Sequence, residues 1–255
     1  MSDDLTACAG IVQRGDPDRF AAVMAAPVDL RRMLLPLYAF NVEVARAPWV
    51  TQEPLIAEMR LQWWRDALEQ IGTGGPVRRH EVVTPLADIL DAEAVHALDG
   101  LIEARRADID KGAPEGRDAL VQYLDETAGT LLWTAARLAG SQTEDAVRAA
   151  GRAQGVVGFL RAVPDLLAKG HHALPHGDPV EEIRVLAETG QQALRQARAS
   201  GFDRAARPVL AVLAGASNVL ARVARAPEAA LDQPVDPAPF RVAARRAAIV
   251  TFGRI

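Results

Sequence analysis

The sequence has very little cysteine, because Cys8 is the only one among 255 residues. A single cysteine excludes a disulfide bond within the chain, and it also excludes a zinc site built from several thiolates. Scarce cysteine is typical of proteins in a reducing compartment. We therefore expect a cytoplasmic protein.

An excess of positive charge and long apolar segments are also missing. The chain has 29 basic and 33 acidic residues, which argues against nucleic acid as a partner, since phosphate binding favours a strongly basic face. No apolar run approaches the roughly 20 residues that cross a membrane. Met1–Gly10 carries two aspartates and lacks the basic stretch and apolar core of a signal peptide. Peripheral contact with a membrane surface stays open as an alternative.

What the sequence does have is apolar residues at helical spacing. They make up 49% of the chain, with alanine and leucine prominent, and this composition favours helix. We predict an all-α protein that forms one domain over residues 1–255, because no break is long enough to be an interdomain linker. A kink or a helix boundary is expected at Pro36. The predicted helices cover 30–47, 55–71, 84–90, 94–111, 117–138, 144–168, 179–200, 202–225 and 237–252.

The segment Tyr38–Arg46 mixes aromatic side chains with an acid, Glu43, and a base, Arg46. It is either part of a site or a core helix whose polar face is solvated.

Three glycines occur close together at Gly151, Gly155 and Gly158, a spacing that places them on one helix face. Each glycine costs a helix about 1 kcal/mol relative to alanine, so something must approach this face closely. Either a neighbouring helix packs there, or a ligand lies against the bare backbone.

Three histidines, His171, His172 and His176, suggest a metal site at first sight. However, Gly170 and Pro175 predict a loop, and no acid lies within the cluster. We predict a polar loop, with metal binding as the alternative.

Four segments, in order and with matching spacing, resemble the squalene/phytoene synthase family. Tyr38–Trp49 resembles the family's first aspartate-rich helix, and Met59–Asp66 resembles its Arg-x-x-Trp-Trp stretch. A segment around Tyr123 resembles Tyr-Cys-x-x-Val-Ala-Gly, and Gly151–Pro175 resembles the second aspartate-rich helix with the loop after it. The resemblance covers a core at 14–200, followed by C-terminal helices at 201–255. It implies the isoprenoid-synthase fold, a helical bundle around a central cavity.

The resemblance also implies magnesium-dependent ionisation of an allylic diphosphate, in which two facing aspartate clusters hold the metal. Here the first cluster is replaced by Ala45, Arg46 and Trp49, and the second by Ala162 and Leu166. A guanidinium about 4 Å from a cation is repelled by about 4 kcal/mol per unit charge pair at an effective dielectric near 20. We therefore predict no metal ligands, no catalytic residues and no cofactor, and expect magnesium only if the protein is a prenyltransferase.

Other family positions predict a ligand site without metal. Arg32 and Arg161 match family arginines near the diphosphate, and with Arg46 and Lys169 they could form a basic mouth for a phosphate or an anionic head group. The alternative is that these cations pair with nearby acids. The predicted binding residues are Arg32, Tyr38, Phe40, Glu43, Arg46, Gly155, Gly158, Phe159, Arg161, Asp165, Lys169 and His171.

The altered positions resemble one branch of the family, an assembly factor of respiratory complex I. The stretches Ala39-Phe40-Asn41-x-Glu43-x-Ala45 and Gly151-x-Ala153-Gln154-Gly155 carry this likeness. It implies a role in assembling the NADH dehydrogenase, complex I subunits or assembly factors as partners, and a lipid or isoprenoid as ligand. One alternative is a prenyltransferase that condenses two isoprenyl diphosphates. The other is a helical scaffold that fills its cavity with its own side chains.

Overall fold

The described part of the chain, residues 3–110, 112–253 and 255, consists of helices and turns without a strand in the computed structural model. This confirms the all-α prediction. The α-helices are α1 (Asp3–Gly15), α2 (Pro17–Ala25), α3 (Val28–Arg46), α4 (Pro54–Gly72), α5 (Val83–Ala87), α6 (Ala92–Ala104), α7 (Arg117–Leu124), α8 (Thr130–Leu138), α9 (Glu144–Ala168), α10 (Pro179–Ser200), α11 (Ala216–Arg225), α12 (Ala229–Asp232) and α13 (Pro239–Phe252).

Several helix boundaries agree with the sequence prediction. Helices α9 and α10 begin and end at the predicted residues. Helix α3 continues through Pro36, so no helix boundary is found there. Helices α1 and α2 precede the first predicted helix. The start of α2 is stabilised by Asp16, which accepts a hydrogen bond from the backbone N–H of Arg19 at 2.9 Å, and by a proline at its first position, where no N–H is needed.

Three predicted helices are interrupted. Residues 202–225 form turns, a 3₁₀ segment at Val209–Gly215 and then α11, so the prediction of one helix was wrong. Pro208 explains this, because it lacks a donor and disfavours helix at the residue before it. Helix α6 ends in a 3₁₀ turn at Arg105–Asp108, and Lys111, the predicted end, lies outside the described residues. The predicted helix 117–138 contains a π-helical turn at Asp125–Gly129.

The π-helical turn is supported by polar contacts on both sides. The hydroxyl of Thr127 donates to the backbone carbonyl of Tyr123 at 2.7 Å. Asp125 accepts two hydrogen bonds from the guanidinium of Arg152, at 2.8 and 2.6 Å. Since Arg152 belongs to α9, this ion pair ties the π-helical turn to that helix.

Helix α9 also approaches this turn through its glycines. A Cβ atom added to Gly151 would lie 2.7 Å from the Cα of Gly129, and one added to Gly155 would lie 2.9 Å from the Cβ of Ala128. Gly158 differs, because a Cβ there would meet nothing within 4 Å. Helix packing therefore explains the first two glycines, and the third lies in open space.

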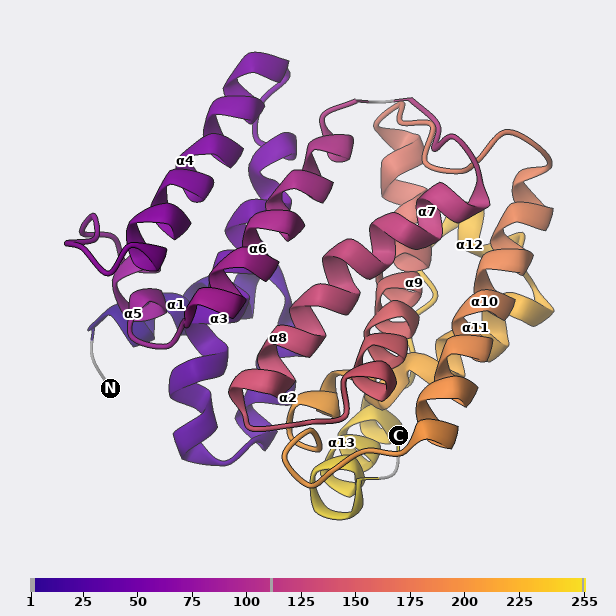
Figure 1. Cartoon of the computed structure of the whole chain (residues 1–255). Coiled ribbons are helices and arrows are strands. Elements are labelled where there is room, and N and C mark those ends of the chain that lie inside the picture. The colour runs from indigo at the N-terminus through magenta and orange to yellow at the C-terminus, as the bar shows by residue number, and fades with distance from the viewer. Residues whose placement is uncertain (1–2, 111, 254) are drawn as a thin grey trace.

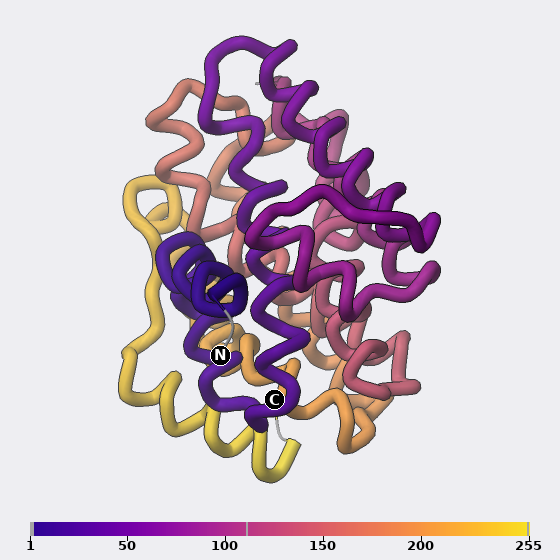
Figure 2. Tube along the Cα trace, turned by 90° about the vertical axis from the view of Figure 1, so that its left-hand side faces the viewer, coloured from indigo at the N-terminus to yellow at the C-terminus, as the bar shows by residue number. Residues whose placement is uncertain are grey.

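The helices are arranged so that the ends of several meet at each end of the bundle (Figure 1). The C-terminal ends of α3 and α9 and the N-terminal end of α4 lie at its upper end in this view. Helix α13 lies across the opposite end, as Figures 1 and 2 both show. Within the described residues, no helix combines the length and the apolar character needed to cross a membrane.

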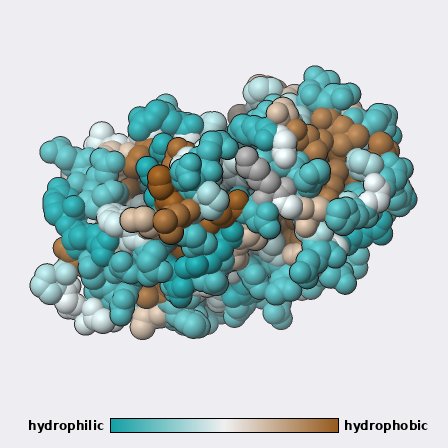
Figure 3. All heavy atoms as spheres, turned by 90° about the horizontal axis from the view of Figure 1, so that it is seen from above, coloured by the Kyte–Doolittle hydropathy of each residue, from teal (hydrophilic) through white to brown (hydrophobic). Residues whose placement is uncertain are grey.

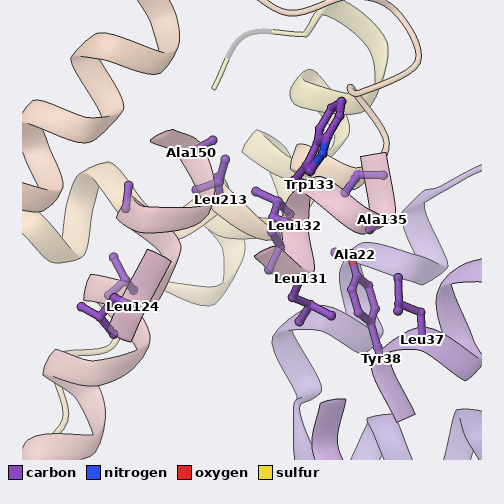
Figure 4. Packing of buried hydrophobic residues seen from close by; sticks show 14 of the residues in the cluster. Ala22, Leu37, Tyr38, Leu124, Leu131, Leu132, Trp133, Ala135, Ala150 and Leu213 are labelled. Atoms are coloured by element: carbon purple, nitrogen blue, oxygen red, sulfur yellow. The ribbon is translucent and has the colours of Figure 1, made fainter. Parts of the chain in front are cut away.

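One cluster of buried apolar residues extends from Cys8 to Ile255. Tyr38 and Phe40 of α3 are 2% and 0% exposed, so both belong to this core. Figure 4 shows Tyr38 in the same part of the core as Leu131 of α8. Burial also raises the pKa of the Tyr38 phenol to about 12, so this hydroxyl stays neutral at physiological pH.

The glycine contacts lead to a prediction about stability. Gly151→Ala should destabilise the protein by about 1–3 kcal/mol, because the new methyl group meets backbone that cannot move aside. Gly158→Ala in the same helix should instead stabilise it by up to about 1 kcal/mol, since alanine is the better helix former. Urea unfolding of both variants measures the difference, and equal effects would contradict the proposed close packing.

A second prediction concerns Cys8. Its side chain is fully buried, its thiol donates to the carbonyl of Glu81 at 3.4 Å, and burial raises its pKa to about 12. Because the thiolate is the reactive form, we expect a thiol reagent at pH 8 to label Cys8 only as fast as the protein unfolds. Labelling should therefore accelerate with urea, whereas rapid labelling of the native protein would show that the Cys8 face of α1 is not packed in the core.

Candidate functional site

The first group of candidate residues lies at the C-terminal end of α3. Arg46 donates to Glu43 at 3.0 Å, one helical turn away. The Arg46 side chain is 56% exposed, so this ion pair contributes at most about 0.5 kcal/mol. Its main effect is on charge, because each group neutralises the other at the position where the family's first acidic cluster would be.

Arg161 of α9 is held by two carboxylates from distant parts of the chain. It donates to Asp18 of α2 at 2.7 Å and contacts Asp236, in the segment between α12 and α13, at 2.6 Å. Burial opposes the charge on this guanidinium, but the two carboxylates more than compensate and raise the pKa of Arg161 above its usual value. Arg161 therefore links α2, α9 and the C-terminal segment.

A hollow of about 480 Å³ lies at the upper end of the bundle. It is formed by the 3₁₀ turn Ala47–Trp49 after α3, the start of α4, the residues after α6 and the loop after α9. Seen from above, this end carries hydrophobic and hydrophilic residues side by side (Figure 3). The lining residues are Pro48, Trp49, Thr51, Gln52, Glu53, Pro54, Ala57, Asp108, Ile109, Asp110, Lys169 and His171.

Two rings meet at this hollow. The centroids of Trp49 and His171 are 4.6 Å apart, with the rings tilted by 46°. The ammonium nitrogen of Lys169 lies 5.8 Å from the centroid of the Trp49 ring, within reach of a cation–π contact. Trp49 stands where the resemblance implies an aspartate, so an altered position now contacts the loop after α9. Trp49 is an altered position that lies outside the predicted set of binding residues.

A polar cluster adjoins the hollow through Asp108. The Tyr123 hydroxyl donates to Asp108 at 2.7 Å and accepts from Arg105 at 2.5 Å, and Arg105 also contacts Asp108 at 3.1 Å. Burial raises the pKa of Tyr123, so the phenol remains protonated and acts as a donor. No local pattern around Asp108 predicted that it would reach this end of the bundle, because the 3₁₀ turn after α6 brings it there.

The remaining predicted residues do not join this hollow. Arg32 lies fourteen residues before Arg46 on α3, which corresponds to roughly 21 Å along the helix. Tyr38, Phe40 and Gly155 are buried in the core, whereas Gly158 and Asp165 are exposed and Phe159 is partly buried. The structure thus brings together Lys169 and His171 of the predicted set. Arg46 and Arg161 are engaged by acids, as the pairing alternative proposed.

The residues at the family's metal positions do not fit magnesium. Mg²⁺ needs oxygen ligands in octahedral geometry, and Ala45, Arg46 and Trp49 supply a methyl group, a cation and an indole. Ala162 and Leu166 on α9 supply only hydrocarbon. No group of three or more His, Cys, Asp or Glu side chains that could hold a metal ion occurs within the described ranges.

Comparison with known proteins shows the family. The model of the squalene/phytoene synthase family matches residues 12–181, and the chain belongs to this family. The curated relatives are assembly factors. The Drosophila melanogaster protein named NADH dehydrogenase (ubiquinone) complex I, assembly factor 6 homolog is 28% identical over 86% of this chain. The Homo sapiens protein named assembly factor 6 of the same complex is 27% identical over 62% of it. The chain spans 66% of the length of the fly protein and 48% of the human one.

Solved structures confirm the predicted fold. A dehydrosqualene synthase crystallised with a ligand aligns with a TM-score of 0.76 over 98% of this chain and 96% of its own, at 14% identity. A squalene synthase from Alicyclobacillus acidocaldarius aligns with a TM-score of 0.73 over 91% of this chain and 95% of its own, at 16% identity. The chain therefore has the isoprenoid-synthase helical fold.

The double pairing of Arg161 is testable. Arg161→Gln should destabilise the protein by about 1 kcal/mol, because it removes a partly buried charged donor that two carboxylates from separate elements share, although Asp18 and Asp236 are themselves 45% and 60% exposed. The control is Arg184→Gln, since Arg184 pairs with Glu181 and Glu188 on the surface of its own helix, and we expect a change within about 0.5 kcal/mol. Thermal unfolding measures both, and equal losses would show that Arg161 does not link separate elements.

Proposed function

We propose that this protein is a non-catalytic member of the squalene/phytoene synthase family that acts in assembly of the respiratory NADH dehydrogenase. The observation that carries the proposal is the replacement of the oxygen ligands at both metal positions, in a chain whose curated relatives are named as complex I assembly factors. The proposed partners are subunits of that complex or other assembly factors. The proposed location is the cytoplasm, at the membrane surface where such a complex resides.

The physical chemistry supports the absence of prenyl transfer. An ionising allylic diphosphate releases a leaving group of about three negative charges, which divalent cations normally neutralise. The side chains that occupy the metal positions cannot ligate such cations, and Arg46 and Arg161 are already engaged by acids of the chain. Arg46 pairs with Glu43, and Arg161 pairs with Asp18 and Asp236. Condensation of two isoprenyl diphosphates is therefore the less favoured function.

We further propose that a lipid or an isoprenoid binds at the hollow beside Trp49. Its volume of about 480 Å³ falls within the range of about 300–1,000 Å³ that is usual for small-molecule sites. Pro48, Trp49 and Ile109 offer apolar contact, and Lys169 offers a cation to a polar head group. Trp49→Ala should weaken binding of a prenyl alcohol. Met24→Ala should not, because Met24 is exposed and does not line the hollow.

Deletion of the gene in the source organism tests the assembly role. We expect NADH dehydrogenase activity in membranes to fall several-fold, with partly assembled complex visible on native gels, and the wild-type gene should restore it. Normal assembly and activity in the deletion strain would refute the proposal.

The catalytic alternative needs its own experiment. Purified protein incubated with farnesyl or geranylgeranyl diphosphate and Mg²⁺ should release no diphosphate and form no squalene or phytoene, because the metal has no ligands. A squalene synthase assayed in parallel serves as the positive control. Product formed at a comparable rate would overturn the non-catalytic assignment.

A further inference from the structure

Helix α13 presents apolar side chains to solvent as well as to the core. Ile249 is fully buried, whereas Phe240 and Phe252, near the two ends of the helix, are 84% and 68% exposed. Such exposure is unusual for phenylalanine, which is normally among the most buried residue types. The other exposed positions on the Phe240 face recur at helical spacing, and they are Ala244, Ala247 and Thr251.

The same helix is basic. It contains no acidic residue and three arginines. Arg246 is turned toward Asp18, 3.9 Å away. Arg241 and Arg245 are exposed, and neither has a hydrogen bond or an ion pair within the part of the chain that the structure describes. They lie roughly 100° and 140° around the helix from Phe240, on either side of Phe252.

Neighbouring segments extend this surface. A hollow of about 620 Å³ beside α13 is lined by Arg204 and Arg207 together with Pro27. Val28, the next residue, is 66% exposed. The acid closest in sequence to these arginines, Asp203, already accepts hydrogen bonds from the backbone N–H groups of Gln142 and Ala206 and from the hydroxyl of Ser141. Asp29 is an exposed acid beside Val28.

The charge of the C-terminal segment, which contains α13, contrasts with that of the rest of the chain. Residues 201–255 contain eight basic and four acidic residues, whereas residues 1–200 contain 21 basic and 29 acidic ones. Most arginines before residue 200 are paired with acids within the described part of the chain. Examples are Arg65, Arg79, Arg106, Arg117, Arg137, Arg148, Arg152 and Arg184. The arginines around α13 are left available for an anionic partner.

We propose that this surface docks the protein on an anionic phospholipid membrane. The α13 face consists of Val28, Phe240 and Phe252 with Arg204, Arg207, Arg241 and Arg245. Helix α13 lies across the end of the bundle (Figure 2), so it can lie flat on a membrane. Phenylalanines enter the region between head groups and acyl chains, and arginines contact lipid phosphates; this is how basic amphipathic helices bind at the interface.

A second exposed apolar patch provides the matched control. Leu55 and Met59, near the start of α4, are 72% and 64% exposed, at the opposite end of the bundle (Figure 1). Here acids are close by, with Glu53 before the helix and Glu58 paired to Arg106 at 2.7 Å. Arg60, which follows Met59, is an exposed cation beside this patch. With acids close by, the patch combines apolar exposure with less positive charge than the α13 face, so it distinguishes non-specific apolar adsorption from charge-dependent docking.

Sedimentation of the purified full chain with lipid vesicles tests the proposal. We expect binding to phosphatidylcholine vesicles that contain phosphatidylglycerol and none to phosphatidylcholine alone. Arg241→Gln with Arg245→Gln should lower the partition constant roughly 30-fold, as expected for two charges at an anionic surface. Phe240→Ser with Phe252→Ser should lower it by about tenfold or more. Leu55→Ser with Met59→Ser should leave it within about twofold of wild type, and thermal unfolding should confirm that all variants are folded.

Three outcomes of the vesicle assay would overturn the proposal. These are no binding to anionic vesicles, equal binding to neutral vesicles, and loss of binding in the α4 variant rather than in the α13 variants. If the α13 variants still bind vesicles but fail to restore NADH dehydrogenase activity in the deletion strain, the face serves an acidic protein partner instead, which also refutes membrane docking. The vesicle assay contains only this protein and lipid, so its result is independent of the proposed assembly role.

Discussion

Two helices can approach backbone to backbone only where no side chain stands between them, and α9 meets this condition at Gly151 and Gly155. At these positions it packs against the π-helical turn Asp125–Gly129, and Arg152 binds Asp125 one turn away. Because α9 is one continuous helix of 25 residues, this contact also sets where its C-terminal half lies. The position of Arg161 and of the loop with His171 therefore depends on it.

The upper end of the bundle shows what happens when the acidic clusters of this fold are lost. In an enzyme, two sets of carboxylates need bound cations, and the substrate diphosphate completes the charge balance. Here Glu43 pairs with Arg46 at this end of the bundle, and farther along α9 Arg161 and Arg246 together face Asp18 and Asp236. Trp49 and His171 fill part of the remaining space by contacting each other. A chain that satisfies its own charges in this way has no need of metal for its stability.

The two ends of the bundle differ in charge, and we propose a ligand site at one end and a membrane-docking face at the other. The hollow beside Trp49 is bordered by Glu53, Asp108 and Asp110, whereas the α13 face is basic. Helix α9 spans the bundle between them, and its 25 residues correspond to roughly 37 Å. If the α13 face lies on a membrane, the hollow points away from it, toward the space where a partner protein would approach. The proposed ligand site and the proposed membrane-docking face are therefore separate surfaces, and occupation of one does not block the other.

The sequence by itself determined the helical class, the limits of α9 and α10, the family and the loss of the metal ligands. Each of these follows from local information, namely apolar periodicity, Gly and Pro punctuation, and residue identity at motif positions. Only the tertiary structure decided the rest. The contact between Trp49 and His171 and the pairing of Arg161 with Asp18 and Asp236 each join residues that lie far apart in the chain. No local pattern specifies which acid a given arginine will meet, because that depends on how the helix ends converge once the core is packed.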